Sequence, residues 1–366
     1  MARGTNSDGD EEAVARLRLM RSARIGPVTY RQLVARFGDA ATALDALPDL
    51  ARRGGGPAPA IAARAVAERE LEAVARLGAR HLFLGGAGYP MLLAQIATAP
   101  PALIVKGEAA LLDRVAVAMV GARNASAAAC RFARQLAHDL GQADVVIVSG
   151  LARGIDAAAH RGALSGGTIG VVAGGIDVYY PPENAPLQRE MEEGGLVVAE
   201  MSPGTEPRAR HFPYRNRIIA GLAQATVVVE AAPKSGSLIT ARQAAEFGRD
   251  VMAVPGSPLD PRAQGCNLLI REGATLIQSA ADVLEMLRPI GGIAEPRRSY
   301  DEPPPPLDAE DGDRRAVTAL LGPVPVAVDE LVRQSARPPA VIQTVLFELE
   351  LAGRLERHAG GRVSLA

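Results

Sequence analysis

Short apolar runs that alternate with helical segments constrain the fold of this chain more than any other feature. Seven such runs, rich in β-branched residues, lie between residues 115 and 277. They are Val115–Val120, Val145–Val148, Ile169–Ala173, Leu196–Ala199, Thr226–Val229, Val251–Val254 and Ala274–Ile277. Nearly uniform apolar character is typical of strands that are covered on both faces. The pattern therefore predicts an α/β fold whose sheet is mostly parallel.

The segment before this sheet is of a different kind. From Glu11 to about Gly78 it is Ala-rich, with helical periodicity and no strand-like alternation. Gly26-Pro27 marks a turn between two amphipathic segments, which is similar to a helix-hairpin-helix or sterile-alpha-motif-like unit. Such a unit can hold a DNA backbone through the N–H groups of its turn. Because one Gly-Pro turn is weak support, we favour the alternative, a plain helical packing domain.

The segment after the sheet divides into two parts. Residues 289–312 are rich in Pro, Gly and charge and are expected to form a linker. Residues 313–366 contain three short helical patterns and then two short strands around Gly360-Gly361, as in a winged helix, which usually suggests duplex DNA. The helical segment VIQTVLFELELAG is strongly apolar and acidic at its polar positions. This favours a protein-contact or structural role for the segment over recognition of duplex DNA.

These patterns predict a Rossmann-like, doubly wound, mostly parallel sheet between an all-α N-terminal domain and a small winged-helix C-terminal domain. The expected divisions are a disordered lead (1–10), a helical domain (11–80), the Rossmann-like domain (81–288), the linker (289–312) and the winged-helix-like domain (313–366). In doubly wound sheets, ligands bind at the carboxyl ends of the strands, near the topological switch point. The loops that follow the predicted strands are therefore the place to search for a site.

Composition limits the functions that need consideration. A net charge of −1 argues against coating nucleic acid by bulk charge, so any such binding needs a local basic patch. The two cysteines, Cys130 and Cys266, make no disulfide framework and indicate a reducing cytoplasm. No apolar run reaches ~18 residues and the N-terminus is acidic and polar, so neither a membrane span nor a signal peptide is expected. With only 6 Phe, 6 Tyr and no Trp, a long base-stacking platform is not expected.

The loop after the run Thr226–Val229 has the character of an anion-binding turn. It reads AAPKSGSLITARQAA, in which a strand, a Gly/Ser turn and a helix start follow one another. Free N–H groups and the positive end of a helix dipole would point at a ligand above the turn. Lys234 adds a charge, and it is one of only two lysines against 38 arginines. Ser235, Gly236 and Ser237 complete a predicted phosphate or polyphosphate site.

The loops after the first two runs carry further basic residues. The first reads VGARNAS, which lacks the GxGxxG spacing of a dinucleotide site. There Gly121 allows a tight turn and Arg123 would project above the sheet toward a phosphate, although an isolated arginine could equally make a surface salt bridge. The second reads SGLARGIDAAAH, where Gly150 makes the turn and Arg153 and Gly154 precede a helix.

A dense basic-aromatic cluster follows the fourth run. Within ten residues it contains four arginines, Arg208, Arg210, Arg215 and Arg217, and two aromatic residues, Phe212 and Tyr214, next to Asn216. Such a composition suits a phosphodiester chain with one or two stacked bases. A solvated helix start is the alternative interpretation.

Three more polar residues have competing interpretations. Asn267 could bind a base edge or cap a helix, and the cap is slightly favoured. Asp156 and His160 share a helical face, but no third metal ligand is evident. We therefore interpret Asp156 as a residue that caps or orients nearby N–H groups, and His160 as a structural residue. No catalytic residue, metal or cofactor is predicted, because the loops hold no nucleophile–base–acid set and no Walker GxxxxGK[ST] motif.

The ordered motifs resemble one known family. The series VGARNAS, SGLARGIDAAAH, GGIDVYYPPEN, FPYRNRIIAGLA, SGSLITARQAAEFGRDVMAVPG and QGCNLLIREGA closely resembles the DNA-processing protein A family, also called DprA or Smf. The resemblance covers the whole predicted sheet, about 170 residues. It implies a non-enzymatic, cytoplasmic single-stranded DNA-binding protein that protects incoming DNA and loads the RecA recombinase in natural transformation. It also implies a homodimer formed through the Rossmann-like domain.

The resemblance also assigns roles to residues that match the motifs. A DNA-binding role is implied for Arg123 in GARN, Arg153 in GLARGID, Asn216 and Arg217 in YRNR, and Lys234 with Ser235, Gly236 and Ser237. Phosphates would be neutralised by Arg and Lys, and bases would stack on Phe212 or on tyrosines such as Tyr214.

Two alternatives from other classes remain. The strand–turn–helix layout also resembles the cytokinin-activating nucleoside-monophosphate phosphoribohydrolases, which carry a PGGxGTxxE loop. Here the loop reads PKSGSLITARQAAE, and Glu246 comes too late for that spacing. A winged-helix duplex-DNA regulator is disfavoured by the near-neutral charge and the acidic polar positions of the C-terminal segment.

Overall fold

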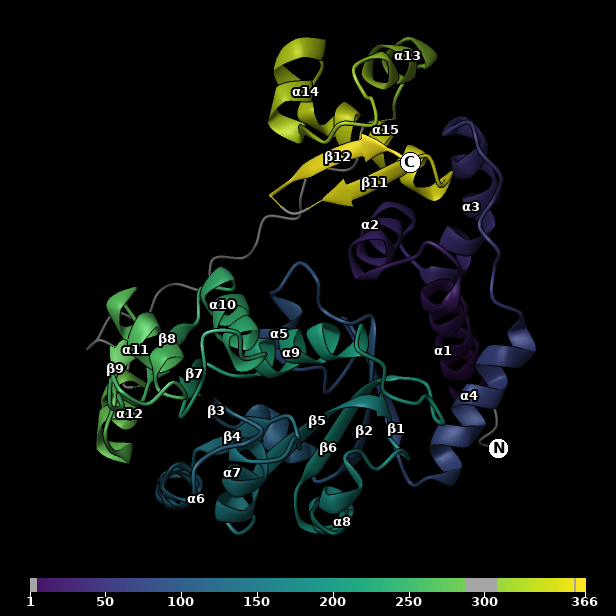
Figure 1. Cartoon of the computed structure of the whole chain (residues 1–366). Helices are drawn as coiled ribbons and strands as arrows, with labels where there is room; N and C mark the ends of the chain where they lie inside the picture. The colour runs from purple at the N-terminus through teal and green to yellow at the C-terminus, as the bar shows by residue number, and fades with distance from the viewer. Residues whose placement is uncertain (1–4, 288–307, 359) are drawn as a thin grey trace, which may run out of the picture. The chain divides into compact units, whose positions relative to one another are not determined.

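The computed structural model describes residues 5–287, 308–358 and 360–366 (Figure 1). The chain divides into two compact units, one formed by Met1–Arg69 with Glu295–Ala366 and the other by Glu70–Ala294. Most of the predicted linker over 289–312 lies outside the described residues. Among the described helices, none combines the length and the apolar character that crossing a membrane requires.

The second unit is built on a nine-stranded sheet with the order β1-β2-β6-β5-β4-β3-β7-β8-β9 (Figure 1). Its strands are β1 (Arg80–Phe83), β2 (Ala102–Gly107), β3 (Ala116–Val120), β4 (Val146–Ser149), β5 (Thr168–Gly175), β6 (Leu196–Met201), β7 (Ala225–Val228), β8 (Asp250–Ala253) and β9 (Thr275–Leu276). The strands β3 to β9 pair in parallel, whereas β1 and β2 are antiparallel to their neighbours. The predicted doubly wound, mostly parallel sheet is confirmed.

Strands β3 to β9 correspond to the seven predicted apolar runs, whereas β1 and β2 were not predicted. In β3, Val117 and Met119 face one layer of the core while Ala118 and Val120 face the other, as expected for a strand covered on both sides. β1 reads RHLF and is only partly buried, so it lacks the continuous apolar character that identifies a central strand.

Helices cover both faces of this sheet. They are α5 (Met91–Ala94), α6 (Ala127–Gln142), α7 (Ile155–Ala163), α8 (Ala185–Gly194), α9 (His211–Leu222), α10 (Ser237–Glu246), α11 (Gln264–Arg271) and α12 (Ala280–Leu287), with short 3₁₀ turns at Ala109–Asp113 and Pro182–Asn184. Figure 1 shows α6 and α7 on one face and α9 and α10 on the other. Leu136 of α6 and Ala159 of α7 belong to one core layer, and Ile218 of α9 belongs to the opposite layer.

The winding reverses next to β3. Successive strands from β3 to β6 are added on one side of β3, whereas β7, β8 and β9 are added on the other. The switch point therefore lies between the carboxyl ends of β3 and β7, where Ala122 N donates a hydrogen bond to Glu230 O at 2.6 Å. Loops from both halves of the sheet meet at this edge.

The first unit combines the helical N-terminal segment with the C-terminal segment. Its helices are α1 (Thr5–Arg21), α2 (Pro27–Phe37), α3 (Ala40–Arg53), the start of α4 (Arg64–Arg76), α13 (Asp311–Ala319), α14 (Val328–Ser335) and α15 (Pro339–Leu351), and its strands are β10 (Val326–Ala327), β11 (Leu355–His358) and β12 (Arg362–Leu365). The predicted winged-helix pattern is therefore confirmed, with β11 and β12 on either side of Gly360-Gly361. The disordered lead predicted for residues 1–10 is corrected, because α1 begins at Thr5; residues 1–4 lie outside the described residues.

The two ends of the chain share one core in this unit. Phe347 and Leu351 of α15 are buried in the same apolar cluster as Leu33 of α2 and Leu47 of α3. The approach is close because Gly54 follows α3, and a Cβ atom there would lie 2.1 Å from Glu348 O. The third helix of the winged-helix domain is thus packed against the N-terminal helices, which agrees with the structural role favoured for its apolar sequence.

Candidate functional site

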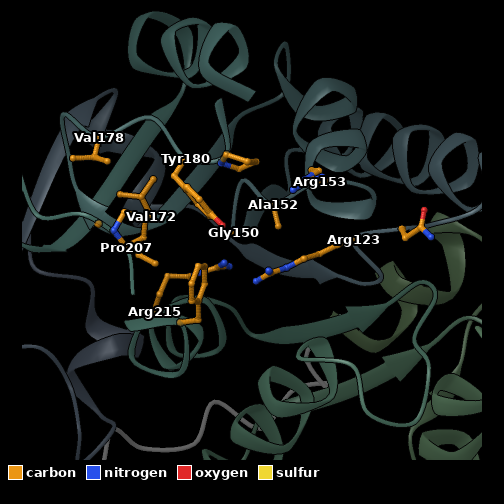
Figure 2. A pocket seen from close by; sticks show the side chains of 14 residues that line it. Arg123, Gly150, Ala152, Arg153, Val172, Val178, Tyr180, Pro207 and Arg215 are labelled. Atoms are coloured by element: carbon orange, nitrogen blue, oxygen red, sulfur yellow. The ribbon is translucent and has the colours of Figure 1, made fainter. Parts of the chain in front are cut away.

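A cavity of about 340 Å³ lies at the carboxyl ends of β3, β4, β5 and β6 (Figure 2). Loops after these strands and the start of α9 form its wall. The lining residues are Arg123, Asn124, Gly150, Ala152, Arg153, Val172, Ala173, Gly174, Val178, Tyr180, Pro181, Pro207, Phe212 and Arg215. The lining thus contains aliphatic and aromatic side chains, and its charged groups are all arginines.

The sheet itself is irregular where it borders the cavity. The register between β5 and β6 shifts between Val172 and Gly175. A Cβ atom on Gly174 would lie 2.6 Å from Thr205 O, so only glycine allows the loop after β6 to approach this closely. Such irregularities redirect a strand near a binding site. Here the shift falls at Val172 to Gly174, which line the cavity.

Arg123 and Arg215 converge on the cavity from opposite sides (Figure 2). The guanidinium carbon of Arg123 lies 5.0 Å from the centre of the Phe212 ring, and that of Arg215 lies 5.8 Å from it. The ring of Tyr180 is tilted against Phe212, with a centroid distance of 6.1 Å. Arginine above an aromatic face gains a cation–π contact and stays available to an anion. The two predicted residues Arg123 and Phe212 are therefore brought together.

Arg215 occupies a buried position beneath Gly150. A Cβ atom on Gly150 would lie 1.4 Å from Arg215 Nη1, so glycine is needed for the guanidinium to fit. Asp156 Oδ2 is 3.9 Å from the same nitrogen. Burial lowers the pKa of Arg215, Asp156 opposes that decrease, and the charge of Arg123 adds to it. Among the described residues, the buried Nε of Arg215 finds no hydrogen-bond acceptor. One carboxylate thus faces two converging guanidinium groups.

Asp156 organises the loop that carries Gly150. Its Oδ2 accepts hydrogen bonds from Gly150 N at 3.2 Å and Ala152 N at 3.3 Å. Burial raises the pKa of Asp156, while Arg215 and these N–H groups oppose the rise. The interpretation of Asp156 as a residue that orients N–H groups is confirmed.

His160 is a buried structural residue, as predicted. Leu151 N donates to His160 Nε2 at 3.3 Å, so that nitrogen carries no proton. The proton is therefore on Nδ1, which donates to Thr168 Oγ1 at 2.7 Å, and Thr168 Oγ1 donates in turn to Ile147 O. Burial, with a contribution from the charge of Arg215, lowers the pKa of His160 to about 3. The imidazole is neutral at physiological pH.

Two further glycines shape the rim. Gly154 has φ +74°, and a Cβ atom there would lie 2.2 Å from Ala122 O. At Gly121 a Cβ atom would lie 2.5 Å from Ile155 Cγ1. These glycines hold the loops after β3 and β4 against each other, which places Arg123 beside Arg153. Arg153 is exposed and lies 3.5 Å from Glu183.

The N-terminus of α6 is already occupied by a carboxylate. Glu230 accepts hydrogen bonds from Ser126 N at 3.0 Å and from Ser126 Oγ at 2.7 Å, and Ser126 Oγ accepts one from Ala129 N. Two of the donors at this helix start, Ser126 N and Ala129 N, are therefore satisfied within the protein. We expect binding by the loop after β3 to depend mainly on the Arg123 side chain.

The loop between β7 and α10 lies on the same sheet edge but does not line the cavity. Lys234 is exposed there, Ser235 Oγ and Ser237 Oγ are 2.7 Å apart, and Gly236 immediately precedes α10. The predicted strand, turn and helix start are confirmed. That these residues bind phosphate stays a prediction.

Arg217 lies away from the cavity, and its predicted role in binding DNA stays a prediction. Its guanidinium makes a 2.5 Å ion pair with Glu200 and donates to Thr98 O at 2.5 Å, and the side chain is buried. Asn216 is buried as well. Both residues lie within α9, which anchors the segment that presents Phe212 and Arg215. Of the YRNR motif, only Arg215 lines the cavity.

Asn267 and Tyr214 also lie away from the cavity. Asn267 is not a helix cap, because it lies inside α11. It braces the preceding loop instead, since its Nδ2 donates to Gly256 O at 2.9 Å and its Oδ1 accepts from Gly256 N at 3.2 Å. Tyr214 is 49% exposed, and Arg217 lies over its ring.

Nine of the fourteen lining residues were not predicted as site residues. Three of the nine, Asn124, Tyr180 and Pro207, lie in loops and carry a polar, an aromatic and a proline side chain. Tyr180 follows β5 in the motif GGIDVYYPPEN, and its place just after a predicted strand is the signal that could have identified it. Pro207 reaches the cavity through the long excursion after β6, which no local pattern reveals.

Comparisons with known proteins agree with this architecture. Residues 80–288 match the family described as DNA recombination-mediator protein A, residues 10–73 a DprA-like N-terminal HHH domain, and residues 301–361 a DprA winged helix domain. The DNA processing protein DprA of Streptococcus pneumoniae is 48% identical over 198 residues, which cover 54% of this chain and 70% of that protein.

Two solved structures are similar in fold. The X-ray structure of DNA processing protein A from Streptococcus pneumoniae has a TM-score of 0.58 and 42% identity, covering 61% of this chain and 78% of that chain. DNA processing protein A from Helicobacter pylori, whose structure describes a single-stranded DNA binding mode, has a TM-score of 0.53 and 28% identity, covering 57% of this chain and 95% of that chain.

Proposed function

This chain belongs to the DNA recombination-mediator protein A family, and we propose that it binds single-stranded DNA at the carboxyl edge of its parallel sheet. The observation that carries the proposal is the convergence of Arg123 and Arg215 on one cavity. Two guanidinium groups with Asp156 as their shared carboxylate leave positive charge that an anion would neutralise. The related protein from Helicobacter pylori binds single-stranded DNA, which supports this ligand.

The shape of the cavity favours an unpaired nucleotide. Its lining includes the aliphatic residues Val172, Ala173 and Val178 and the aromatic residues Phe212 and Tyr180. An unstacked base can lie against aromatic and aliphatic groups, while its phosphate remains at the arginines. The bases of a duplex are stacked inside the helix and would not reach this surface without being flipped out. Single strands should therefore bind in preference to duplexes.

We also propose that the site binds rather than catalyses. The cavity lining contains no carboxylate, imidazole or thiol side chain. Of the two carboxylates beside lining arginines, Asp156 is buried and accepts hydrogen bonds from Gly150 N and Ala152 N, and Glu183 lies 3.5 Å from Arg153. General acid–base catalysis requires a titratable group within reach of the substrate. Apart from the phenol of Tyr180, the lining offers cationic and aromatic contacts but no such group.

Three finer functions rest on the family alone. We propose that the bound strand is protected and delivered to the RecA recombinase in natural transformation, that the chain forms a homodimer, and that it acts in the cytoplasm. Two grooves on one dimer would raise avidity for a long strand without new contacts. Both cysteines are free thiols, as suits a reducing compartment.

The proposal is tested by measuring the affinity for fluorescent oligo-dT and for a matched duplex across a salt series. Single strands should bind more tightly than the duplex. Arg123→Ala should weaken binding and flatten the log–log salt slope by about 0.7, because one phosphate contact is lost. The salt slope of Lys234→Ala tests in the same way whether the loop before α10 contacts a phosphate. Arg271→Ala, at the end of α11, removes an exposed charge as a control.

Tighter binding of the duplex would contradict the proposal. So would a salt slope for Arg123→Ala equal to that of the wild type. If only Lys234→Ala keeps the wild-type slope, the cavity retains its role and the β7–α10 loop lies outside the path of the strand.

A further inference from the structure

A second basic surface lies on the outer side of α6 and α7. We name it the α6/α7 arginine patch and define it as Arg131, Arg134 and His138 of α6 with Arg161 of α7. These residues border a shallow hollow of about 430 Å³, to which Gln135 and Ser165 also contribute. None of the patch residues belongs to the lining of the first cavity.

Helical periodicity places the patch in solvent. Arg131, Arg134 and His138 are spaced three and four residues apart, so they form one stripe along α6. The opposite stripe of the helix is buried against the sheet and consists of Ala133, Leu136, Ala137 and Leu140. All four patch residues are exposed. The amphipathic pattern of α6 thus fixes the direction in which its charges point.

Close packing of the two helices brings the charges together. A Cβ atom on Gly162 would lie 2.1 Å from Arg134 O, so glycine lets α7 touch the backbone of α6. This contact sets Arg161 beside the Arg134 turn. The charge of Arg161 is also felt at Cys130, where burial raises the thiol pKa and Arg161 opposes the rise.

The arginines of the patch lack acidic partners. In the part of the chain that the structure describes, no ion pair involves Arg131, Arg134 or Arg161, whereas Arg217 is paired with Glu200. Asp139, the nearest acidic residue along α6, accepts a hydrogen bond from Gln135 Nε2 at 2.8 Å. Three positive charges around one hollow, in a chain of net charge −1, form a local site for a polyanion.

The patch continues from the arginines of the cavity. α6 begins four residues after Arg123, and α7 begins two residues after Arg153. At 1.5 Å per residue, Arg134 lies roughly 10 Å and Arg161 roughly 9 Å along their helices from these starts. At ~3.4 Å per stacked nucleotide, this distance corresponds to about three nucleotides. A strand that leaves the cavity can therefore reach the patch within a few phosphates.

We propose that the α6/α7 arginine patch is a second contact site for single-stranded DNA, which holds the backbone of the strand after it leaves the cavity. The proposal rests on the proposed function, since it requires a strand in the cavity. We expect the patch to contact phosphates only, because no Phe, Tyr or Trp side chain lines the hollow.

The test compares the full-length wild type with the double variant Arg131→Ala/Arg134→Ala on oligo-dT of two lengths. Six nucleotides are near the lower end of the ~4–16 that single-strand sites cover, and 30 nucleotides extend well beyond the cavity. The variant should bind the short strand like the wild type. On the long strand its salt slope should fall by about 1.4, which makes binding about 25-fold weaker at 0.1 M salt. Arg76→Ala/Arg271→Ala removes two exposed charges elsewhere and should change neither length.

Equal affinity of wild type and variant for the long strand would overturn the proposal, and a patch that serves an acidic protein would give this result. An equal loss of affinity for the two strand lengths would also overturn the proposal, since the substitutions would then affect binding in the cavity itself. Failure of the proposed function has a different signature, because the wild type itself would not bind either oligonucleotide in an Arg123-dependent way.

Discussion

At the scale of single residues, the site depends on the lack of a side chain at Gly150. The guanidinium of Arg215 occupies the space that a side chain at Gly150 would take. Arg215 is buried and held near Asp156, so it cannot move into solvent without losing its packing. Replacing Gly150 by alanine therefore tests whether binding depends on where the Arg215 guanidinium lies.

We expect Gly150→Ala to weaken the binding of single strands while the protein stays folded. Overpacking of this kind costs about 1–3 kcal/mol of the free energy of unfolding. Affinity for oligo-dT is measured together with a denaturant titration. Gly204→Ala serves as a control for stability alone. Alanine at Gly204 would strain the backbone, which has φ +76° there, but its Cβ atom would contact no other residue. Unchanged affinity of Gly150→Ala would separate Arg215 from the site.

The residue scale is also where prediction from the sequence reached its limit. Arg215 and Arg217 stand two positions apart in one motif, and both are buried. Only the packing of α9 against β6 and the segment near Thr98 decides that Arg217 meets Glu200, while Arg215 faces the cavity. Composition identified the cluster, but the partner of each guanidinium is a property of contacts far apart in the sequence.

At the scale of elements, the apolar runs predicted β3 to β9 because each of these strands is covered on both faces. β1 and β2 complete the sheet by antiparallel pairing at its edge. The residues of an edge strand do not by themselves predict which strand it pairs with. The location of the site could also be predicted from the parallel strands. The carboxyl ends of parallel strands share one edge, so Arg123, Gly150 and Phe212 could be expected together.

His160 connects α7 to two strands and makes this connection sensitive to pH. Its pKa is about 3 in the folded chain and 6.5 without burial, so below pH 6.5 only the unfolded chain takes up the proton. The folded state should therefore lose up to about 2 kcal/mol between pH 7 and pH 5, with full stability above pH 6.5. Denaturant titrations at pH 7, 6 and 5 measure this loss.

The variant His160→Gln should show a smaller loss over the same interval. His138→Gln, which changes an exposed imidazole on α6, should keep the wild-type dependence. His211 also has a lowered pKa, through burial and the charges of Arg210 and Arg208, so some dependence remains in either variant. An identical pH dependence for His160→Gln and the wild type would mean that His160 is not the neutral buried imidazole described above.

At the scale of the whole molecule, the two ends of the chain stabilise each other. Besides the shared apolar cluster, Arg24 Nη1 donates to Leu351 O at 3.0 Å and Arg354 Nη1 donates to Gly54 O at 3.0 Å. Arg314 pairs with the buried Glu348 at 2.7 Å. The third helix of a winged helix commonly enters the major groove of a duplex. Here most of α15 is buried, so this surface is not available for that role in the described arrangement.

We expect Phe347→Ala to destabilise the N-terminal helices as well as the winged helix. Removing this buried ring should cost about 3–5 kcal/mol. Hydrogen exchange should then be faster in α2 and α3, which are distant in sequence from the substitution. Val324→Ala changes an exposed residue of the same C-terminal segment and should leave exchange unchanged. Faster exchange confined to α13, α14 and α15 would show that the two ends are independent.

The shared core of the two ends also has a consequence during synthesis. The halves of this unit are separated by about 225 residues of the sheet unit. At ~5–20 residues per second, a ribosome needs roughly 10–45 s to cross that distance. During this time the apolar surface of α3 is complete, but Phe347 and Leu351 have not yet been made. The newly made N-terminal helices must therefore wait for the last helix with an apolar surface uncovered, so chaperones would have their first opportunity to bind the chain there.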